Sequence, residues 1–171
     1  MKPKILLFSL LLSPTVALAQ TAALSVSFAD TAWDGVNVPA GQHCAKYGGR
    51  GASPALKVSN IPAHANRIIV AFSNGAYKKL DDGGHGIIGM QISPGTTTVQ
   101  FPSIAENTID MPKEIYIVSA QKGDWGKEGA AYMAPCSGGK ASRYYATVRA
   151  VNEIDGAVTE LGKTDIELGK Y

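Results

Sequence analysis

Short apolar runs separated by turn residues are the feature that most constrains the fold of this chain. The runs either alternate apolar and polar residues or are rich in β-branched and aromatic ones, which is typical of strands. They cover residues 23–28, 67–72, 87–92, 114–119 and 144–151. Only residues 104–111 have a spacing that suits a short helix. We therefore expect a mainly β protein, an antiparallel β-sandwich with few short helices.

Turn residues stand between these runs throughout the chain. They include Asn60-Ile61-Pro62, Asp81-Asp82-Gly83-Gly84, Ser93-Pro94-Gly95 and Asp155-Gly156. Gly supplies positive φ angles in such turns, and Pro fixes φ near −65°. Because Gly and Pro are scattered instead of collecting at one boundary, we expect no interdomain linker.

The first residues have the pattern of an export signal. Lys2 and Lys4 precede an apolar run over residues 5–12, and Ala17-Leu18-Ala19 supplies small residues for cleavage after Ala19. The apolar run is shorter than the ~20 residues that a membrane-spanning helix needs, so we expect no transmembrane segment. The sequence thus predicts a signal peptide over residues 1–19, a single domain over residues 20–171, and a periplasmic or secreted protein.

The charge balance of the chain is close to even. The 171 residues include 16 basic and 14 acidic ones, and loss of Lys2 and Lys4 with the signal would leave 14 of each. A near-neutral chain lacks the basic excess that binds nucleic acid or an anionic membrane through bulk electrostatics. We therefore expect neither as a partner.

Two cysteines, Cys44 and Cys136, lie far apart in the sequence. An even number of cysteines in an exported chain favours a disulfide between them, because the exterior and the periplasm are oxidising. A pair of buried free thiols is the alternative. A zinc site would need more ligands than two cysteines and the adjacent His43.

An ordered series of short motifs runs along the chain from about residue 28 to residue 145. The motifs are Val38-Pro39, His43-Cys44, Gly51-Ala52-Ser53-Pro54-Ala55-Leu56, Gly84-His85, Gly123-Asp124-Trp125-Gly126-Lys127, Ala134-Pro135-Cys136 and Ser142-Arg143-Tyr144-Tyr145. Their order resembles the phosphatidylethanolamine-binding protein (PEBP) family in its bacterial form, and the chain looks like a divergent secreted member. The resemblance implies a PEBP-like β-sandwich with a pocket for a small anion.

The resemblance also implies which residues line that pocket. The loop with His43 would form one wall, and the rim with Trp125 and Pro135 the opposite wall. His85 stands where the family has a histidine that faces a phosphate-like ligand. Two further donors to an anion, Arg143 and Tyr144, fall where the family has His-Arg-Tyr.

Two of these residues also have a purely structural interpretation. His85 between two glycines is alternatively a satisfied histidine at a turn. Arg143 is alternatively a structural partner of a carboxylate such as Asp124.

Two departures from the family pattern bear on the pocket. Ser142 replaces the histidine of the His-Arg-Tyr motif, and Ser73-Asn74-Gly75 stands where the family has an acidic Asp-Pro-Asp-x-Pro motif. The second change removes a carboxylate that normally shapes the pocket. Both changes suggest a second hypothesis, in which the pocket is vestigial and the protein acts through a protein partner, as a protease or signalling inhibitor.

An enzyme is the least favoured hypothesis. One of Ser53, Ser73, Ser137 and Ser142 would have to combine with His85 and with Asp81 or Asp82, but the sequence has no Gly-x-Ser-x-Gly elbow. The histidines at positions 43, 64 and 85 do not have metal-ligand spacing. We expect a non-enzymatic domain without metal or cofactor that binds a small anionic ligand or phospholipid headgroup.

Overall fold

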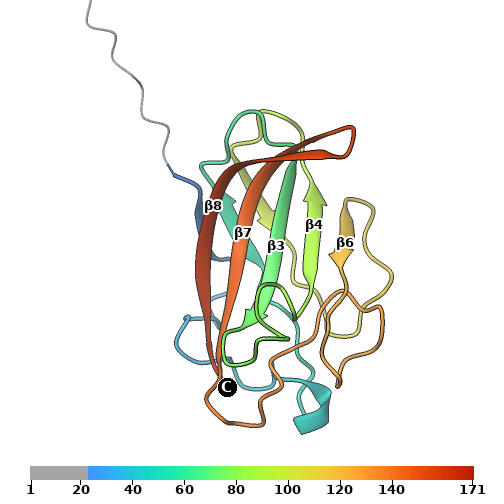
Figure 1. The fold of residues 1–171 in the computed structure, drawn as a ribbon. Helices are drawn as coiled ribbons and strands as arrows, with labels where there is room; N and C mark the ends of the chain where they lie inside the picture. Colours follow the sequence, from blue (N-terminus) through green and yellow to red (C-terminus); the bar gives the residue numbers. More distant parts are fainter. Residues whose placement is uncertain (1–22) are drawn as a thin grey trace, which may run out of the picture.

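The computed structural model describes residues 23–171, so the predicted signal peptide lies outside the described residues. These residues form two antiparallel sheets that face each other, and Figure 1 shows the larger sheet in front. The larger sheet has the order β6-β4-β3-β7-β8, and the smaller one the order β1-β2-β5. The strands of the larger sheet are β3 (Arg67–Asn74), β4 (Ile87–Gln91), β6 (Ile115–Ser119), β7 (Arg143–Ile154) and β8 (Ala157–Lys170); those of the smaller are β1 (Ser25–Phe28), β2 (Leu56–Ser59) and β5 (Thr98–Phe101).

The core lies between the inner faces of the two sheets. Leu56, Val58 and Phe101 of the smaller sheet are fully buried, and they belong to one apolar cluster with Ile68 and Val148 of the larger sheet. Side chains alternate across a strand, so the buried residues of β2 lie two apart and direct one face of the strand inward. Mainly β architecture with two antiparallel sheets confirms the predicted fold class.

The strands β7 and β8 form a long hairpin at one edge of the larger sheet (Figure 1). Its turn is Asp155-Gly156, with φ angles of 51° and 81°, and these positive angles match the right-handed twist of the flanking strands. The far ends of the two strands meet where Arg143 pairs with Lys170. At this same end β3 finishes at Asn74, so three strand ends support one group of loops.

The structure agrees with five predicted strands and corrects the predicted helix. Residues 104–111 contain no helix, because Asn107 adopts a φ of 63° and the backbone donors bond elsewhere. Glu106 donates its N–H to the Gly51 carbonyl, and Asn107 donates to the Tyr132 carbonyl. The helix within residues 23–171 is instead a single 3-10 turn, η1 (Ala45–Tyr47).

A disulfide joins Cys44 and Cys136 across 92 residues of sequence, with a Cα–Cα distance of 5.2 Å. This confirms the predicted pairing. Cys44 directly precedes η1, and its N–H donates to the Pro135 carbonyl at 3.0 Å. The covalent link and the hydrogen bond together hold η1 against the segment that leads into β7.

No helix among residues 23–171 has the length and apolar character needed to span a membrane.

Candidate functional site

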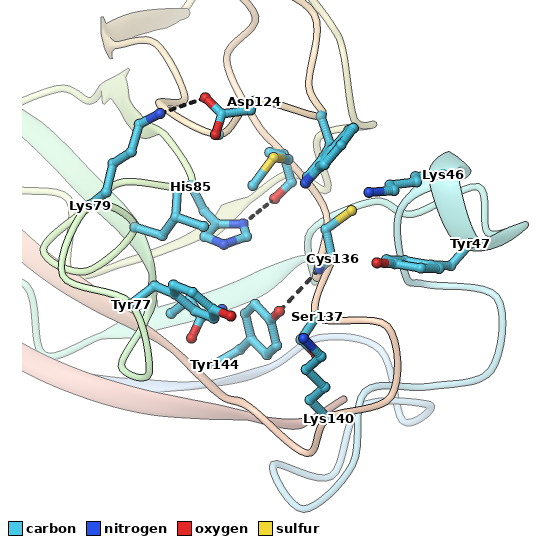
Figure 2. Close-up of a pocket in the computed structure, with 15 residues that line it drawn as sticks. Lys46, Tyr47, Tyr77, Lys79, His85, Asp124, Cys136, Ser137, Lys140 and Tyr144 are labelled. Carbon is cyan, nitrogen blue, oxygen red and sulfur yellow. Dashed lines mark hydrogen bonds and ion pairs between the residues drawn. The ribbon is translucent and has the colours of Figure 1, made fainter.

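A cavity of about 350 Å³ lies at the end of the larger sheet where β3 finishes and β7 begins. Four separate parts of the chain form it: η1, the loop after β3, the segment 123–125, and the segment 133–140 that leads to β7. Figure 2 shows their side chains converging from opposite sides. The disulfide holds two of these parts together, since Cys136 itself lines the cavity.

His85 reaches this cavity from a tight turn before β4. A Cβ atom on Gly84 would lie 2.3 Å from the Leu80 Cα, and one on Gly86 would lie 1.9 Å from the carbonyl oxygen of Ala131. Gly86 also has a φ of 117°, which L side chains rarely adopt. The two glycines are therefore required for the chain to pass close to its neighbours while it directs the imidazole inward.

The imidazole of His85 is almost completely buried, with 2% of the residue exposed. Its Nδ1 lies 2.7 Å from the carbonyl oxygen of Met133, whereas its Nε2 has no hydrogen-bond partner among the described residues. Burial lowers the pKa of His85 from 6.5 to about 4, because desolvation disfavours the charged ring and outweighs the hydrogen bond to Met133. The ring is therefore neutral at pH 7.

Tyr144, the second residue of β7, packs against His85. The two rings meet edge to face, with centroids 5.3 Å apart. The N–H of Cys136 donates to the Tyr144 hydroxyl at 3.0 Å, and burial raises the pKa of Tyr144, so this hydroxyl is neutral at physiological pH. Tyr144 thus connects the histidine to the disulfide segment (Figure 2).

Positive charge dominates the rim. Lys46, Lys79 and Lys140 line the cavity against a single carboxylate, Asp124, which leaves an excess of two positive charges. Lys79 Nζ lies 2.5 Å from the Asp124 carboxylate, and Lys46 Nζ lies 2.9 Å from the ring centroid of Trp125. Lys140 forms no ion pair within residues 23–171. The rim is thus suited to attract a small anion.

Asn74 forms part of the wall at the end of β3. It is buried, and its side-chain oxygen accepts a hydrogen bond from the Ala76 N–H at 2.9 Å. The side-chain NH2 group makes no hydrogen bond to the described part of the chain, so it remains available as a donor. Asn74 therefore contributes a neutral amide to the wall and no negative charge.

Three of the six predicted ligand-binding residues line the cavity, namely His85, Tyr144 and Trp125. The other three lie outside it. His43 stacks on Tyr171 with ring centroids 4.7 Å apart, and Pro135 uses its carbonyl to accept from Cys44.

Arg143 is the third residue outside the cavity. It makes a bidentate pair with Glu167, in which Nε lies 2.9 Å from Oε2 and a terminal nitrogen donates to Oε1. Its guanidinium also lies over the ring of Tyr145 at 4.5 Å. Arg143 is thus a structural partner of a carboxylate, as the alternative interpretation of the sequence held. The carboxylate is Glu167 and not Asp124.

Ser142 also lies outside the cavity. It is buried, and its backbone pairs with Tyr171 through two hydrogen bonds of 2.9 and 3.2 Å.

Sequence reasoning missed the three lysines and the two tyrosines Tyr47 and Tyr77, and it did not predict that Asn74 itself lines the cavity. A signal was present for Lys46 and Lys140, because a disulfide between Cys44 and Cys136 brings the residues near these cysteines to one place. Tyr77 and Lys79 carried no such signal. Their loop reaches the cavity through the hydrogen bond from the Asn74 N–H to the Leu80 carbonyl at 2.8 Å.

The candidate catalytic serines and aspartates make other contacts. Ser73 Oγ accepts from the Gly83 N–H at 2.9 Å, Ser137 donates to the Tyr171 carbonyl, and Asp81 accepts from the Tyr145 hydroxyl. Among residues 23–171 no group of three or more His, Cys, Asp or Glu side chains is placed to hold a metal ion.

Comparison with known proteins supports the fold alone. No protein-family model matches the sequence, and no curated protein matches it significantly. The chain is similar in structure to a phosphatidylethanolamine-binding protein (PEBP) homolog, CT736, from Chlamydia trachomatis, with a TM-score of 0.51 and 18% sequence identity over 87% of this chain and 97% of that chain. This chain therefore has a PEBP-like fold, the architecture that its motif series implied.

Proposed function

We propose that this protein is a non-enzymatic, exported binding domain whose His85 cavity takes a small anionic group, such as a phosphate or a phosphorylated headgroup. The observation that carries the proposal is the unpartnered Nε2 of a nearly fully buried histidine in a cavity with excess positive charge. A buried polar atom without a partner costs roughly 1–3 kcal/mol, and a ligand that bonds to it recovers that free energy.

The charges around the cavity support an anion over a cation or a neutral ligand. Three lysines outnumber the single carboxylate, and the amide of Asn74 adds a neutral donor. Lysine binds phosphate as a flexible point charge, which suits a cavity with an open rim. In Figure 2 Lys46 lies on the right and Lys140 below, and the ammonium groups of both point toward the cavity, so an anion bound there interacts with both.

Export is supported by the disulfide. A link between Cys44 and Cys136 persists in an oxidising compartment and is rare in the cytosol, so it is compatible with a location outside the cytoplasm. The predicted signal over residues 1–19 is the second support for export, and it rests on the sequence alone.

A role without catalysis is supported by the orientation of His85. A general base in a hydrolase is oriented by a carboxylate and lies within reach of a nucleophile. The Nδ1 atom of His85 instead bonds to a backbone carbonyl, and Ser73 and Ser137 are bonded elsewhere.

The proposal is tested by a two-dimensional NMR titration of the oxidised protein with phosphate and with phosphoethanolamine. Saturable shifts are expected for amides of residues 74–86, 123–126 and 133–140, and not for those of the β7–β8 turn at residues 155–156. Lys140→Ala should weaken binding several-fold, whereas Lys113→Ala, at an exposed position outside the cavity, should not. The absence of any saturable shift at millimolar ligand rejects the proposal.

A protein partner is the second candidate, and the aromatic rim favours it. Tyr47, Tyr77 and Trp125 line the mouth of the cavity and are all exposed, with Trp125 at 61%. Exposed aromatic residues are enriched at the centres of protein interfaces. Capture from a host envelope extract with the wild-type protein and with Trp125→Ala tests this candidate: a specific partner that is lost with the variant supports it, and recovery of no specific partner counts against it.

A further inference from the structure

The hydrogen bond to Met133 determines which ring nitrogen of His85 carries the hydrogen. A carbonyl oxygen accepts hydrogen bonds and never donates them, so the contact of 2.7 Å to Met133 requires the hydrogen on Nδ1. The Met133 N–H in turn donates to the His85 carbonyl at 3.0 Å, which fixes the two residues relative to each other. In the neutral ring, Nε2 then carries only a lone pair and acts as an acceptor.

The surroundings keep the ring neutral. Burial lowers its pKa to about 4, because desolvation disfavours the charged ring and outweighs the hydrogen bond to Met133. The titratable side chains that line the cavity with His85 are Lys46, Tyr47, Tyr77, Lys79, Asp124, Lys140 and Tyr144. The one acidic group, Asp124, is paired with Lys79 and is 76% exposed, so it does not compensate a charge on the buried ring.

We propose that the His85 cavity selects anions that carry their own hydrogen, namely hydrogen phosphate and singly ionised phosphomonoesters, over anions without a hydrogen, such as sulfate and phosphodiesters. The selection rests on the proposed function, since it concerns the ligand of the same cavity. The P–OH group donates to the Nε2 atom of His85, and the remaining oxygens accept from the lysines and from the Asn74 amide.

An anion without a hydrogen has no good arrangement in this cavity. Any oxygen that it brings to His85 places one lone pair against another, and both atoms are left without a hydrogen bond. Sites that are built to bond a donor reject analogues that lack it, by factors that reach about 10⁴ in fully closed pockets. The open rim of this cavity reduces that factor, so we expect at least about a tenfold difference.

Electrostatic attraction alone predicts that sulfate binds more tightly than phosphate. At pH 6 inorganic phosphate is mainly a monoanion, because its second pKa is near that of a phosphorylated side chain, at about 6 to 7. Sulfate is a dianion at the same pH and is attracted more strongly by the lysines. Preference for phosphate over sulfate therefore separates a hydrogen bond at His85 from simple attraction.

The first test compares sodium phosphate with sodium sulfate, by calorimetry or NMR, on the purified disulfide-bonded protein at pH 6 and constant ionic strength. Phosphate is expected to bind at least tenfold more tightly. Equal affinities, or tighter sulfate binding, overturn the selection while leaving the proposed anion cavity intact. Absence of binding by both anions rejects the anion cavity itself, and the selection with it.

The second test uses two organic phosphates that differ by one hydrogen. Methyl phosphate has a P–OH group at pH 5.5 and loses it by pH 8, whereas dimethyl phosphate has none at either pH. Methyl phosphate is expected to bind at least tenfold more weakly at pH 8 than at pH 5.5, and dimethyl phosphate is expected to bind weakly at both. Undiminished binding of methyl phosphate at pH 8, or equal binding of the diester, overturns the selection.

A variant of His85 tests whether its imidazole ring causes the preference for phosphate over sulfate. In His85→Gln the terminal amide turns either its NH2 group or its oxygen toward the ligand, so the ratio of phosphate to sulfate affinity is expected to fall below threefold. An unchanged ratio in the folded variant overturns the assignment to His85. The comparisons on the wild-type protein do not depend on the folding of this variant.

Discussion

The Nδ1 atom of His85 lies 2.7 Å from the carbonyl oxygen of Met133, and the Met133 N–H donates back to the His85 carbonyl. This double contact holds a neutral imidazole at the end of the larger sheet, with Nε2 left unpartnered among the described residues. The buried ring has consequences for stability, for local backbone geometry and for binding.

Stability should fall between about pH 6.5 and pH 4 because of His85. Its pKa is 6.5 when unfolded and about 4 when folded, so the unfolded chain takes up the proton first as the pH falls. The contribution is fully present above pH 6.5 and is lost by pH 4, and it amounts to roughly 3 kcal/mol. Urea denaturation from pH 4 to pH 7.5 measures it.

The control for the pH effect is His85→Gln, which has no titrating ring at this position. The difference in free energy of unfolding between wild type and variant should change across this pH window, because contributions from all other groups cancel. A constant difference would show that His85 titrates normally in the folded protein.

Gly86→Ala should be severely destabilising. The new Cβ would lie 1.9 Å from the Ala131 carbonyl oxygen, at a φ of 117°. We expect a loss of roughly 3 kcal/mol or more in the free energy of unfolding. Gly95→Ala is the matched control, since Gly95 also has a positive φ but open space around it, and it should cost about 1 kcal/mol. Equal losses would contradict the close approach at Gly86.

Reduction of the disulfide should lower the free energy of unfolding by an amount on the order of 4 kcal/mol. The link closes a loop that spans 92 residues, and its loss frees the unfolded chain. Denaturation with and without reductant measures the change. The double variant Cys44→Ser and Cys136→Ser should resemble the reduced protein and should not respond to reductant; any response in it would point to another target of the reductant.

Arg143→Ala should leave anion binding unchanged. Its guanidinium is occupied by Glu167 and Tyr145 outside the cavity. The pair with Glu167 is about half exposed, so its loss should cost less than about 1 kcal/mol. Phosphate titration of Arg143→Ala beside Lys140→Ala gives the comparison, and weaker binding in the arginine variant would restore Arg143 as a ligand residue.

The strands that the sequence predicted are those with a one-sided or fully buried pattern. β3 is buried along most of its length and reads as a continuous apolar run, so it was found. β8 is the longest strand and was missed, because it lies at the edge of the sheet and is exposed over most of its length. Only residues 163–168 alternate exposed and less exposed side chains, and pairing with β7 places the whole strand in the sheet.

His85 could be singled out from the sequence because its place in the motif series matches a histidine of the PEBP pattern. Lys46, Lys79 and Lys140 look like ordinary surface lysines in the sequence, and they meet only because the disulfide and the loop after β3 bring them together. Arg143 was also suggested by its motif, but the pairing of β7 with β8, which places Glu167 opposite Tyr145, brings a carboxylate to its guanidinium outside the cavity.

The measurement that tests this account most directly is a nitrogen-15 NMR spectrum of the His85 imidazole, recorded at pH 7 before and after addition of phosphate. The account predicts a neutral ring with its hydrogen on Nδ1, and an Nε2 resonance that moves saturably as phosphate binds, while the Nδ1 resonance changes little. A protonated ring in the free protein, or an Nε2 resonance that phosphate leaves unchanged at millimolar concentration, would contradict it.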